Sequence, residues 1–353
     1  MSFTYNNNIK LNIFGTSHSP YMGINIEGIS AGVSLDIELI KKAIERRKPY
    51  NNKVSTTRIE NDNFEFVSGV FKGFTTGGVI SILVKNENCN SKDYDFEVFR
   101  PSHADYTAYI KYKGFNDYRG GGFFSGRLTL LLVIAGSICK QMMKEVKIVS
   151  HVKKIGNIVD DDINLNVIDR LSSEIFPVVN EDVKDKMIKL IEKISEEGDS
   201  IGGIIEIIVR GVDIGIGDPY FDSVESIISH LLFSIPAVKG VEFGRGFDFA
   251  NYKGSEINDS YTIIDDKIRT TSNNNGGING GITNGEDIKL SVCIKPTPSI
   301  LISQNTVNIN KERVNYSIRG RHDSAIIARS AIIIESVIAI ALYDLYLARK
   351  KEV

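Results

Sequence analysis

The class of fold open to this chain is decided by residues 325–347, AIIARSAIIIESVIAIALYDLYL. The stretch has the length and the apolar character of a membrane span. Three charged side chains interrupt it, Arg329, Glu335 and Asp344, and charges of this kind are expensive inside a bilayer. The stretch therefore predicts a long, mostly buried helix at the centre of a globular protein.

The composition of the whole chain agrees with a globular enzyme. Its 353 residues are 42% hydrophobic and 24% charged, with a net charge of −2, so nothing favours nucleic acid as a partner. Length alone allows one large domain or two. The three cysteines show no metal-ligand spacing, and the N-terminal segment lacks the apolar run of a signal peptide. These features favour a reducing cytoplasm, no metal site and no membrane partner.

Hydrophobic periodicity predicts the elements around this helix. Met22, Ile24 and Ile26 alternate with less apolar residues, as in a half-buried strand. Residues 34–47 predict a helix with Ser34 as its cap, and its apolar face is made of Leu35, Leu39, Ala43 and Ile44. Further helices are predicted within residues 128–143, 183–197 and 223–235, and further strands within residues 64–70, 79–84, 199–213 and 287–295.

Residues 100–127, RPSHADYTAYIKYKGFNDYRGGGFFSGR, concentrate the groups that an anionic ligand requires. His103 can carry a proton at neutral pH, and Arg119 and Arg127 flank the glycines at 120–122. Bare glycine backbone lets a ligand approach closely and offers N–H groups to an anion. Taken alone, the stretch is equally compatible with a glycine-rich turn around a buried, hydrogen-bonded histidine.

Four other segments gather cations, hydroxyls, amides and histidine. They lie around His18 in GTSHSP, around Arg47, within the glycine- and asparagine-rich residues 271–285, and from Lys295 to Asp323. No phosphate-binding loop, dinucleotide fingerprint, zinc motif or nucleophile elbow is present. What remains is a large site for polyanionic ligands, with two or three histidines able to move protons.

The motifs in these segments resemble the chorismate synthase family. They are GTSHSP, RRKP…STTR, SGVFKGFTTGG, RPSHADYTAYIKYKGFNDYRGGG, EGDSIGG, SIPAVKGVEFGRGF, NNNGGINGGITNGEDI, KPTPSI and RGRHD, in family order over nearly the whole chain. The resemblance implies an α+β fold, a β-α-β sandwich with helices packed between antiparallel sheets. It also implies a single domain over residues 1–353 with internally similar strand–helix halves, assembled as a homotetramer.

The resemblance further implies a lyase of the shikimate pathway of aromatic amino-acid biosynthesis. Its reaction is the anti-1,4 elimination of phosphate from 5-enolpyruvylshikimate 3-phosphate, which gives chorismate. Reduced FMN (FMNH2) is required although the reaction has no net redox change. Because the substrate carries two carboxylates and a phosphate, it accounts for the many cations in these motifs.

Site residues follow from the matching motifs. His18 is expected to protonate the leaving phosphate, and His103 is expected to lie beside N1 of the flavin and protonate the reduced ring. Asp323, with Ser17 and Ser125, is expected to manage the proton at flavin N5. The expected anion-binding residues are Arg47, Lys53, Arg127 and Arg321. The expected FMN contacts are Phe123, Phe124, Ser125, Ala237, Gly280, Lys295, Pro296, Thr297, Pro298, Ser299 and Arg321. His322 belongs to the same motif without an assigned role.

The chain departs from the family's usual motifs at three places. GESHG becomes GTSHS, and GGGRSSARET becomes GGGFFSGRLT, which puts Phe123 and Phe124 at flavin-contacting positions. Lys53 stands where the family commonly has arginine, and it keeps the charge without the bidentate geometry. The lost cation at position 123 weakens phosphate binding, unless the rings pack on the flavin instead. A second hypothesis is therefore a catalytically impaired homologue that binds flavin or a polyanion. A third variant carries its own NADPH-dependent flavin reductase activity, for which the sequence has no signature.

Overall fold

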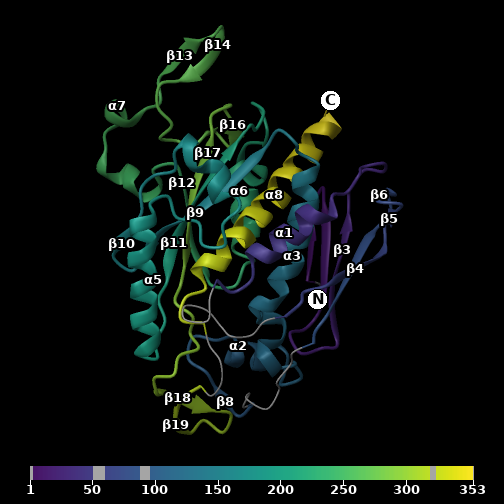
Figure 1. Ribbon diagram of the computed structural model, residues 1–353, viewed down its shortest axis with the longest axis vertical. Helices are drawn as coiled ribbons and strands as arrows, with labels where there is room; N and C mark the ends of the chain where they lie inside the picture. The colour runs from purple at the N-terminus through teal and green to yellow at the C-terminus, as the bar shows by residue number, and fades with distance from the viewer. Residues whose placement is uncertain (1–2, 51–59, 88–95, 319–322, 353) are drawn as a thin grey trace.

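A computed structural model describes residues 3–50, 60–87, 96–318 and 323–352, and it has two five-stranded antiparallel sheets with helices between them (Figure 1). The first sheet runs in the order β1 (Thr4–Asn6), β2 (Lys10–Gly15), β3 (Tyr21–Glu27), β7 (Ile80–Lys85) and β4 (Phe64–Ser68). The second runs in the order β10 (Ile158–Val159), β9 (Lys147–Ile155), β11 (Gly203–Arg210), β17 (Ile288–Ile294) and β12 (Val238–Phe243). The expected α+β sandwich is confirmed.

The helices that fill the sandwich are α1 (Ile37–Arg46), α3 (Thr129–Gln141), α6 (Val224–Leu232) and α8 (Ile327–Glu352). Helix α8 packs on α3, α6, β9 and β11, while α3 also packs on α1 and on β3 of the opposite sheet. One continuous cluster of buried side chains joins both sheets through these helices. Apolar helices therefore occupy the layer between the two sheets.

Smaller elements surround this sandwich. A three-stranded sheet of β8 (Val98–Phe99), β18 (Gln304–Asn308) and β19 (Arg313–Tyr316) lies at one end, and the hairpin β13 (Tyr261–Ile264)–β14 (Lys267–Thr270) projects from the other (Figure 1). The remaining hairpins are β5 (Val70–Phe71)–β6 (Phe74–Thr75) and β15 (Ile278–Asn279)–β16 (Ile282–Thr283). The peripheral helices are α2 (Asp105–Lys111), α4 (Ile168–Leu171), α5 (Glu181–Glu196) and α7 (Gly254–Ile257).

Helix α8 is the buried core helix that its sequence predicts. The two segments with the length and composition of a membrane span, Arg119–Gln141 and Ile327–Lys351, have 78% and 83% of their apolar windows buried inside the fold. Each of the three charges noted within residues 325–347 has a protein partner. Glu335 accepts two 2.8 Å hydrogen bonds from Arg46, Asp344 accepts a 2.7 Å hydrogen bond from the backbone N–H of Ile9, and Arg329 donates to Asp323 at 2.8 Å. Paired in this way, the charges are compatible with a protein interior.

Close contact between α3 and α8 depends on Gly136. A Cβ at this position would lie 2.3 Å from the backbone oxygen of Ser336. The absence of a side chain lets the two helices cross in contact, and their crossing fixes the layer onto which both sheets pack.

Helix α1 differs from its predicted form at the start and on one face. It begins at Ile37, and Asp36 rather than Ser34 is its N-cap, because the Asp36 carboxylate accepts the backbone N–H groups of Glu38 and Leu39 at 2.9 and 3.2 Å. Ser34 instead forms a β-bridge with Phe74. Leu39 is 48% exposed, so its placement on the apolar face was wrong, and Ile40 holds the buried position.

The other elements that can be compared follow the predictions closely. Met22, Ile24 and Ile26 of β3 are fully buried. In β17 the alternating residues Ile288, Leu290, Val292 and Ile294 all face the core. Helices α3, α5 and α6 appear where periodicity placed them, while the strand predicted over residues 199–213 is shorter and forms β11.

Candidate active site

A cavity of about 880 Å³ brings together segments that are far apart in the sequence. Its wall contains most of the residues singled out from the sequence: Arg47, His103, Phe123, Phe124, Ser125, Arg127, Ala237, Lys295, Thr297, Pro298, Ser299 and Asp323. Ser17, His18, Pro296 and Gly280 are not among its lining residues. Lys53, Arg321 and His322 fall outside the part of the chain that the structure describes.

His103 is presented to the cavity by the turn between β8 and α2. Ser102, just before it, has a left-handed backbone with φ +57°. The His103 Nδ1 lies 3.0 Å from the carbonyl oxygen of Pro101, and its Nε2 lies 2.8 Å from Ser299 Oγ. Because a carbonyl only accepts, Nδ1 carries the proton of the neutral imidazole, and the Ser299 hydroxyl donates to Nε2. The proton-exchanging atom is thus Nε2.

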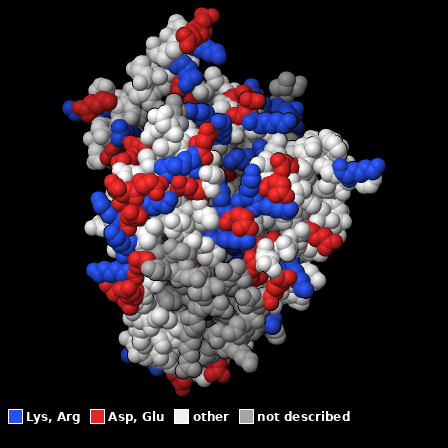
Figure 2. Space-filling view, viewed as in Figure 1, with Lys and Arg blue, Asp and Glu red and all other residues white. Residues whose placement is uncertain are grey.

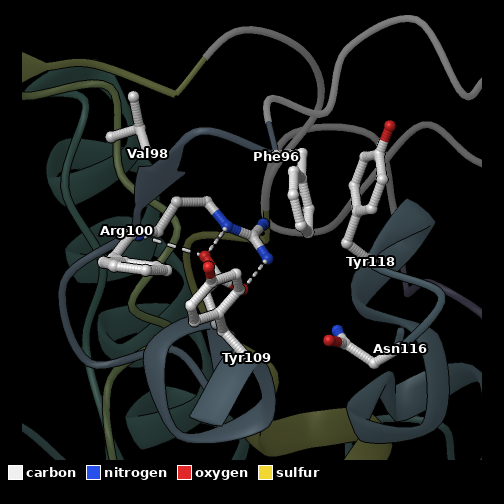
Figure 3. A pocket seen from close by; sticks show the side chains of 8 residues that line it. Phe96, Val98, Arg100, Tyr109, Asn116 and Tyr118 are labelled. Carbon is white, nitrogen blue, oxygen red and sulfur yellow. Dashed lines mark hydrogen bonds and ion pairs between the residues drawn. The ribbon is translucent and has the colours of Figure 1, made fainter. Parts of the chain in front are cut away.

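The surroundings of His103 disfavour its charged form. Burial, followed by the positive charge of Arg100, lowers the pKa of His103 to about 4. Figure 3 shows Arg100 near the rings of Phe96 and Tyr109. The Arg100 guanidinium donates to the Asp105 carboxylate at 2.7 and 2.8 Å. This ion pair ties the end of β8 to the start of α2 and fixes the turn that carries His103.

The partner of His103, Ser299, is held by a rigid turn after β17. Ser200 Oγ donates to the Thr297 carbonyl at 2.6 Å, and Gly202 leaves room for the chain at Pro296, whose nitrogen would lie 3.0 Å from a Cβ there. Lys295 Nζ donates to the Ser102 carbonyl at 3.0 Å, which joins this turn to the turn of His103. The two predicted motifs therefore meet at one wall of the cavity.

The glycine loop at 120–122 lies against the histidine of the GTSHSP turn. Gly120 has a φ of +61°, and a Cβ on it would come within 1.9 Å of His18 Nδ1 and 2.8 Å of Ser17 Oγ. His18 and Ser17 are buried behind this loop, while Gly120 and Gly121 line the cavity itself. Only glycine at position 120 allows this approach, so the loop forms a thin partition between His18 and the cavity.

Two residues that depart from the family motifs, Thr16 and Phe123, make identifiable contacts in the structure. Thr16 Oγ1 donates to Asp117 at 3.0 Å and so docks the GTSHSP turn onto the loop. Phe123 packs against Phe3 and Tyr112 with ring centroids 4.8 and 5.9 Å apart. Phe123 lines both the main cavity and an adjoining cavity of about 550 Å³, so its ring lies between two spaces.

Arg47 and Arg127 lie on the cavity wall at the ends of α1 and of the turn before α3. Arg127 donates to Glu60 at 3.0 Å and to Asn86 at 3.3 Å, and it also pairs with Asp62. Arg47 donates to Thr129 Oγ1 at 3.1 Å, and its Nη1 lies 3.7 Å from Asp62. Neither Glu60 nor Asp62 was predicted as a site residue from the sequence.

The charged groups around Arg47 include both cations and carboxylates. Burial, followed by the nearby guanidinium of Arg329, lowers the pKa of Arg47 to about 9, and Asp62 acts in the opposite direction. Arg329 is in turn paired with Asp323 at 2.8 Å. On the face seen in Figure 2, Lys and Arg are interspersed with Asp and Glu.

Arg119 does not take the role that its position beside the glycines suggested. It pairs with Asp117 at 2.8 and 3.0 Å, it is exposed, and it is not among the lining residues.

Gly280 lies in the turn of the β15–β16 hairpin, and no heavy atom of the described residues lies within 4 Å of the position that a Cβ would take there. The FMN contact expected of Gly280 stays a prediction.

Comparison with known proteins defines the class. Residues 9–347 match the family described as chorismate synthase. Chorismate synthase from Korarchaeum cryptofilum is 41% identical over 348 residues, covering 95% of each chain, and that from Pyrococcus abyssi is 42% identical over 347 residues, covering 97% of each. A crystal structure of chorismate synthase superposes with a TM-score of 0.75 at 25% identity, covering 97% of this chain and 92% of the other.

The helix-filled sandwich and these matches define a phosphate-eliminating lyase. The chain belongs to the chorismate synthase family. Its function is in the shikimate pathway, which leads to the aromatic amino acids.

Proposed function

We propose that this cavity binds 5-enolpyruvylshikimate 3-phosphate beside reduced FMN and eliminates the phosphate to give chorismate. The observation that carries the proposal is the convergence of the His103–Ser299 pair with the Arg47–Arg127 cluster in one cavity. The two regions supply a proton site and an anion site, which the elimination of phosphate from a substrate with three anionic groups requires.

The residues present fit a flavin mononucleotide. Thr297 Oγ1 and Asn116 Oδ1 are buried on the cavity wall without a hydrogen-bond partner among the described residues, so each can bind a polar edge of a ligand. Lys295 and Lys239 lie on the same wall and offer positive charge to a phosphate. When bound, reduced FMN supplies a transient electron that assists departure of the phosphate.

His103 would hold and move the proton at the flavin edge through Nε2. In the protein without ligand its pKa of about 4 keeps it neutral at pH 7. An anionic ring placed next to Nε2 would raise that pKa, while Pro101 keeps Nδ1–H fixed. The proton affinity of His103 thus increases when the anionic ligand arrives.

The remaining proton steps are assigned to residues near the glycine loop. His18 would protonate the leaving phosphate across the partition at Gly120, with Ser17 beside it. Asp323 and Ser125, both on the cavity wall, would manage the proton at flavin N5. Arg47 and Arg127, together with Lys53 and Arg321, would bind the carboxylates and phosphate of the substrate.

An anaerobic assay with chemically reduced FMN tests this function. The chain is expected to release one phosphate for each chorismate formed, and no product at saturating reduced flavin would refute it. Titration with oxidised FMN, with and without substrate, distinguishes an active enzyme from a catalytically impaired homologue. Binding without turnover would favour the impaired homologue. NADPH oxidation in the same mixture decides whether the chain reduces its own flavin.

The assembly and compartment of the protein are part of the same proposal. We expect a homotetramer located in the cytoplasm, as in the family, and sedimentation equilibrium measures the former directly. Cell fractionation with antibody detection measures the latter. A monomer at micromolar concentration, or protein confined to a membrane fraction, would contradict these expectations.

A further inference from the structure

Asp62 stands between the two arginines proposed to bind substrate. Its carboxylate pairs with Arg127 Nη1 through Oδ1, and its Oδ2 lies 3.7 Å from Arg47 Nη1. The side chains of Asp62, Arg47 and Arg127 are only 5%, 4% and 8% exposed. A single carboxylate therefore contacts both guanidinium groups where little water screens them.

Other donors of each arginine bind neighbouring protein groups. Arg47 donates through Nε to Thr129 and through Nη2 to the Gly126 carbonyl at 2.9 Å. Arg127 donates through Nε to Asn86, which itself donates to the Thr16 and Ser19 carbonyls on either side of His18. The orientation of the arginines is thus linked to the turn that holds His18.

The backbone of Asp62 has an unfavourable conformation that its surroundings maintain. Its φ is +54°, in the left-handed region that residues with a Cβ rarely adopt, although asparagine and aspartate tolerate it best. The side chain is nonetheless buried against two cations on the wall of the main cavity. Strain of this kind persists only where surrounding contacts determine the conformation.

We infer that Asp62 is a positioning residue that clamps Arg47 and Arg127 together and keeps the pair oriented and charged to receive the substrate's anionic groups. This inference rests on the proposed function. The opposite role, a carboxylate that occupies the arginines and is displaced by substrate, would make Asp62 a competitor. The two roles predict changes of opposite sign in substrate affinity.

The charges around Arg47 provide a second test of this inference, through the pKa of Arg47. The charged groups that act on Arg47 are Arg329 of α8, Arg127, Asp62 and Asp323, and the first two lower its pKa while the carboxylates raise it. Removing the charge of Asp62 therefore moves the deprotonation of Arg47 to lower pH. A residue that stabilises the fold without acting on Arg47 would leave unchanged the pH at which Arg47 loses its proton and substrate binding is lost.

The test compares Asp62→Asn with Glu60→Gln, a matched variant that alters a carboxylate touching Arg127 but not Arg47. Calorimetric titration with 5-enolpyruvylshikimate 3-phosphate is carried out from pH 7 to pH 10, with oxidised FMN present and absent. Asp62→Asn is expected to raise Kd about tenfold at pH 7.5 and to move the alkaline loss of binding about one pH unit lower. Glu60→Gln is expected to weaken binding less and to leave that limit unmoved.

Each other outcome overturns the inference. A lower Kd for Asp62→Asn establishes displacement by substrate instead of clamping, and an unchanged Kd and pH limit show that Asp62 has no role in binding. If Asp62→Asn fails to fold, Asp62→Glu keeps the charge and must retain the alkaline limit while raising Kd, and a lowered limit contradicts the clamp. Wild-type protein that binds no substrate would overturn the proposed function itself.

Discussion

A half-buried histidine, His103, and a buried one, His151, have opposite acid–base properties. Burial and a neighbouring arginine lower the pKa of His103 to about 4. His151, on β9, lies between carboxylates, with Asp160 2.8 Å from Nδ1 and Glu206 3.1 Å from Nε2. Burial opposes its charge, but hydrogen bonds from the imidazolium to Asp160 and then to Glu206 raise its pKa overall.

The contacts of the two imidazole rings account for this difference in pKa. His151 has both nitrogens committed to carboxylates, and Asp160 also accepts backbone N–H groups from Val179 and Asn180, so the cluster ties loops to the sheet. His103 has one nitrogen fixed by a carbonyl and the other directed to a serine on a cavity wall. A ligand can alter the proton affinity of His103 and leave that of His151 unchanged.

The largest expected effect is on catalysis by His103→Ala. Removing a positioned proton donor typically slows the chemical step by 10²–10⁴-fold, so a loss of about 1,000-fold in kcat is expected. The free energy of unfolding is expected to change by less than about 1 kcal/mol, since no buried charge loses its partner. Anaerobic turnover and denaturant unfolding measure the two quantities, and a near-wild-type rate would remove the assigned role.

The reverse pattern is expected for His151→Ala. It leaves the carboxylates of Asp160 and Glu206 facing each other without the imidazolium, which destabilises a buried ion network by about 3 kcal/mol. Specific activity per folded molecule is expected to stay within about twofold, because His151 is not among the residues that line the cavity. Lost activity in a stably folded variant would contradict the division between the two histidines.

Gly120→Ala extends the comparison to His18. The new methyl group would overlap His18 Nδ1, so activity is expected to fall about 30-fold as the ring is displaced. Gly121→Ala is the matched control, because it also has positive φ, +81°, yet its Cβ would meet only Ser125 at 3.8 Å. Equal losses in the two variants would attribute the effect to backbone strain and would remove the argument for His18.

The smallest expected effect is the pH dependence of stability. His151 has a raised pKa, so its contribution is complete below pH 6.5 and is lost as pH rises through its folded pKa. His103 has a lowered pKa, so it destabilises the fold as pH falls from 6.5 toward 4. The Tm difference between wild type and His151→Ala is expected to change by about 2 °C on the alkaline side. The Tm difference between wild type and His103→Ala is expected to change by about 2 °C on the acid side.

Much of the fold was accessible from periodicity because the core elements are strongly apolar. The helix over residues 325–347 and the strand carrying Ile288 to Ile294 are examples in which burial alone dictates the pattern. The start of α1 was missed because Ser34 and Asp36 are both good caps, and a tertiary bridge to Phe74 decided between them. Local sequence has no information on that contact.

The site was predictable to the extent that its motifs are continuous. His103 and Ser299 were each identified, yet their 2.8 Å contact joins positions 196 residues apart and follows from packing alone. Glu60 and Asp62 were missed because a carboxylate in an anion-binding site contradicts the simple expectation of cations. Their function depends on the arginines they contact, which only the folded chain brings near them.

The central claim is that the proton affinity of His103 is low in the free protein and is raised by the bound anion. An NMR titration of the imidazole C2–H signals, with His103→Ala to assign the resonance, measures it directly. The account predicts an apparent pKa near 4 without ligand and an increase of at least one unit when substrate and FMN are added. A free-protein value near 6.5, or a value that substrate and FMN leave unchanged, would contradict it.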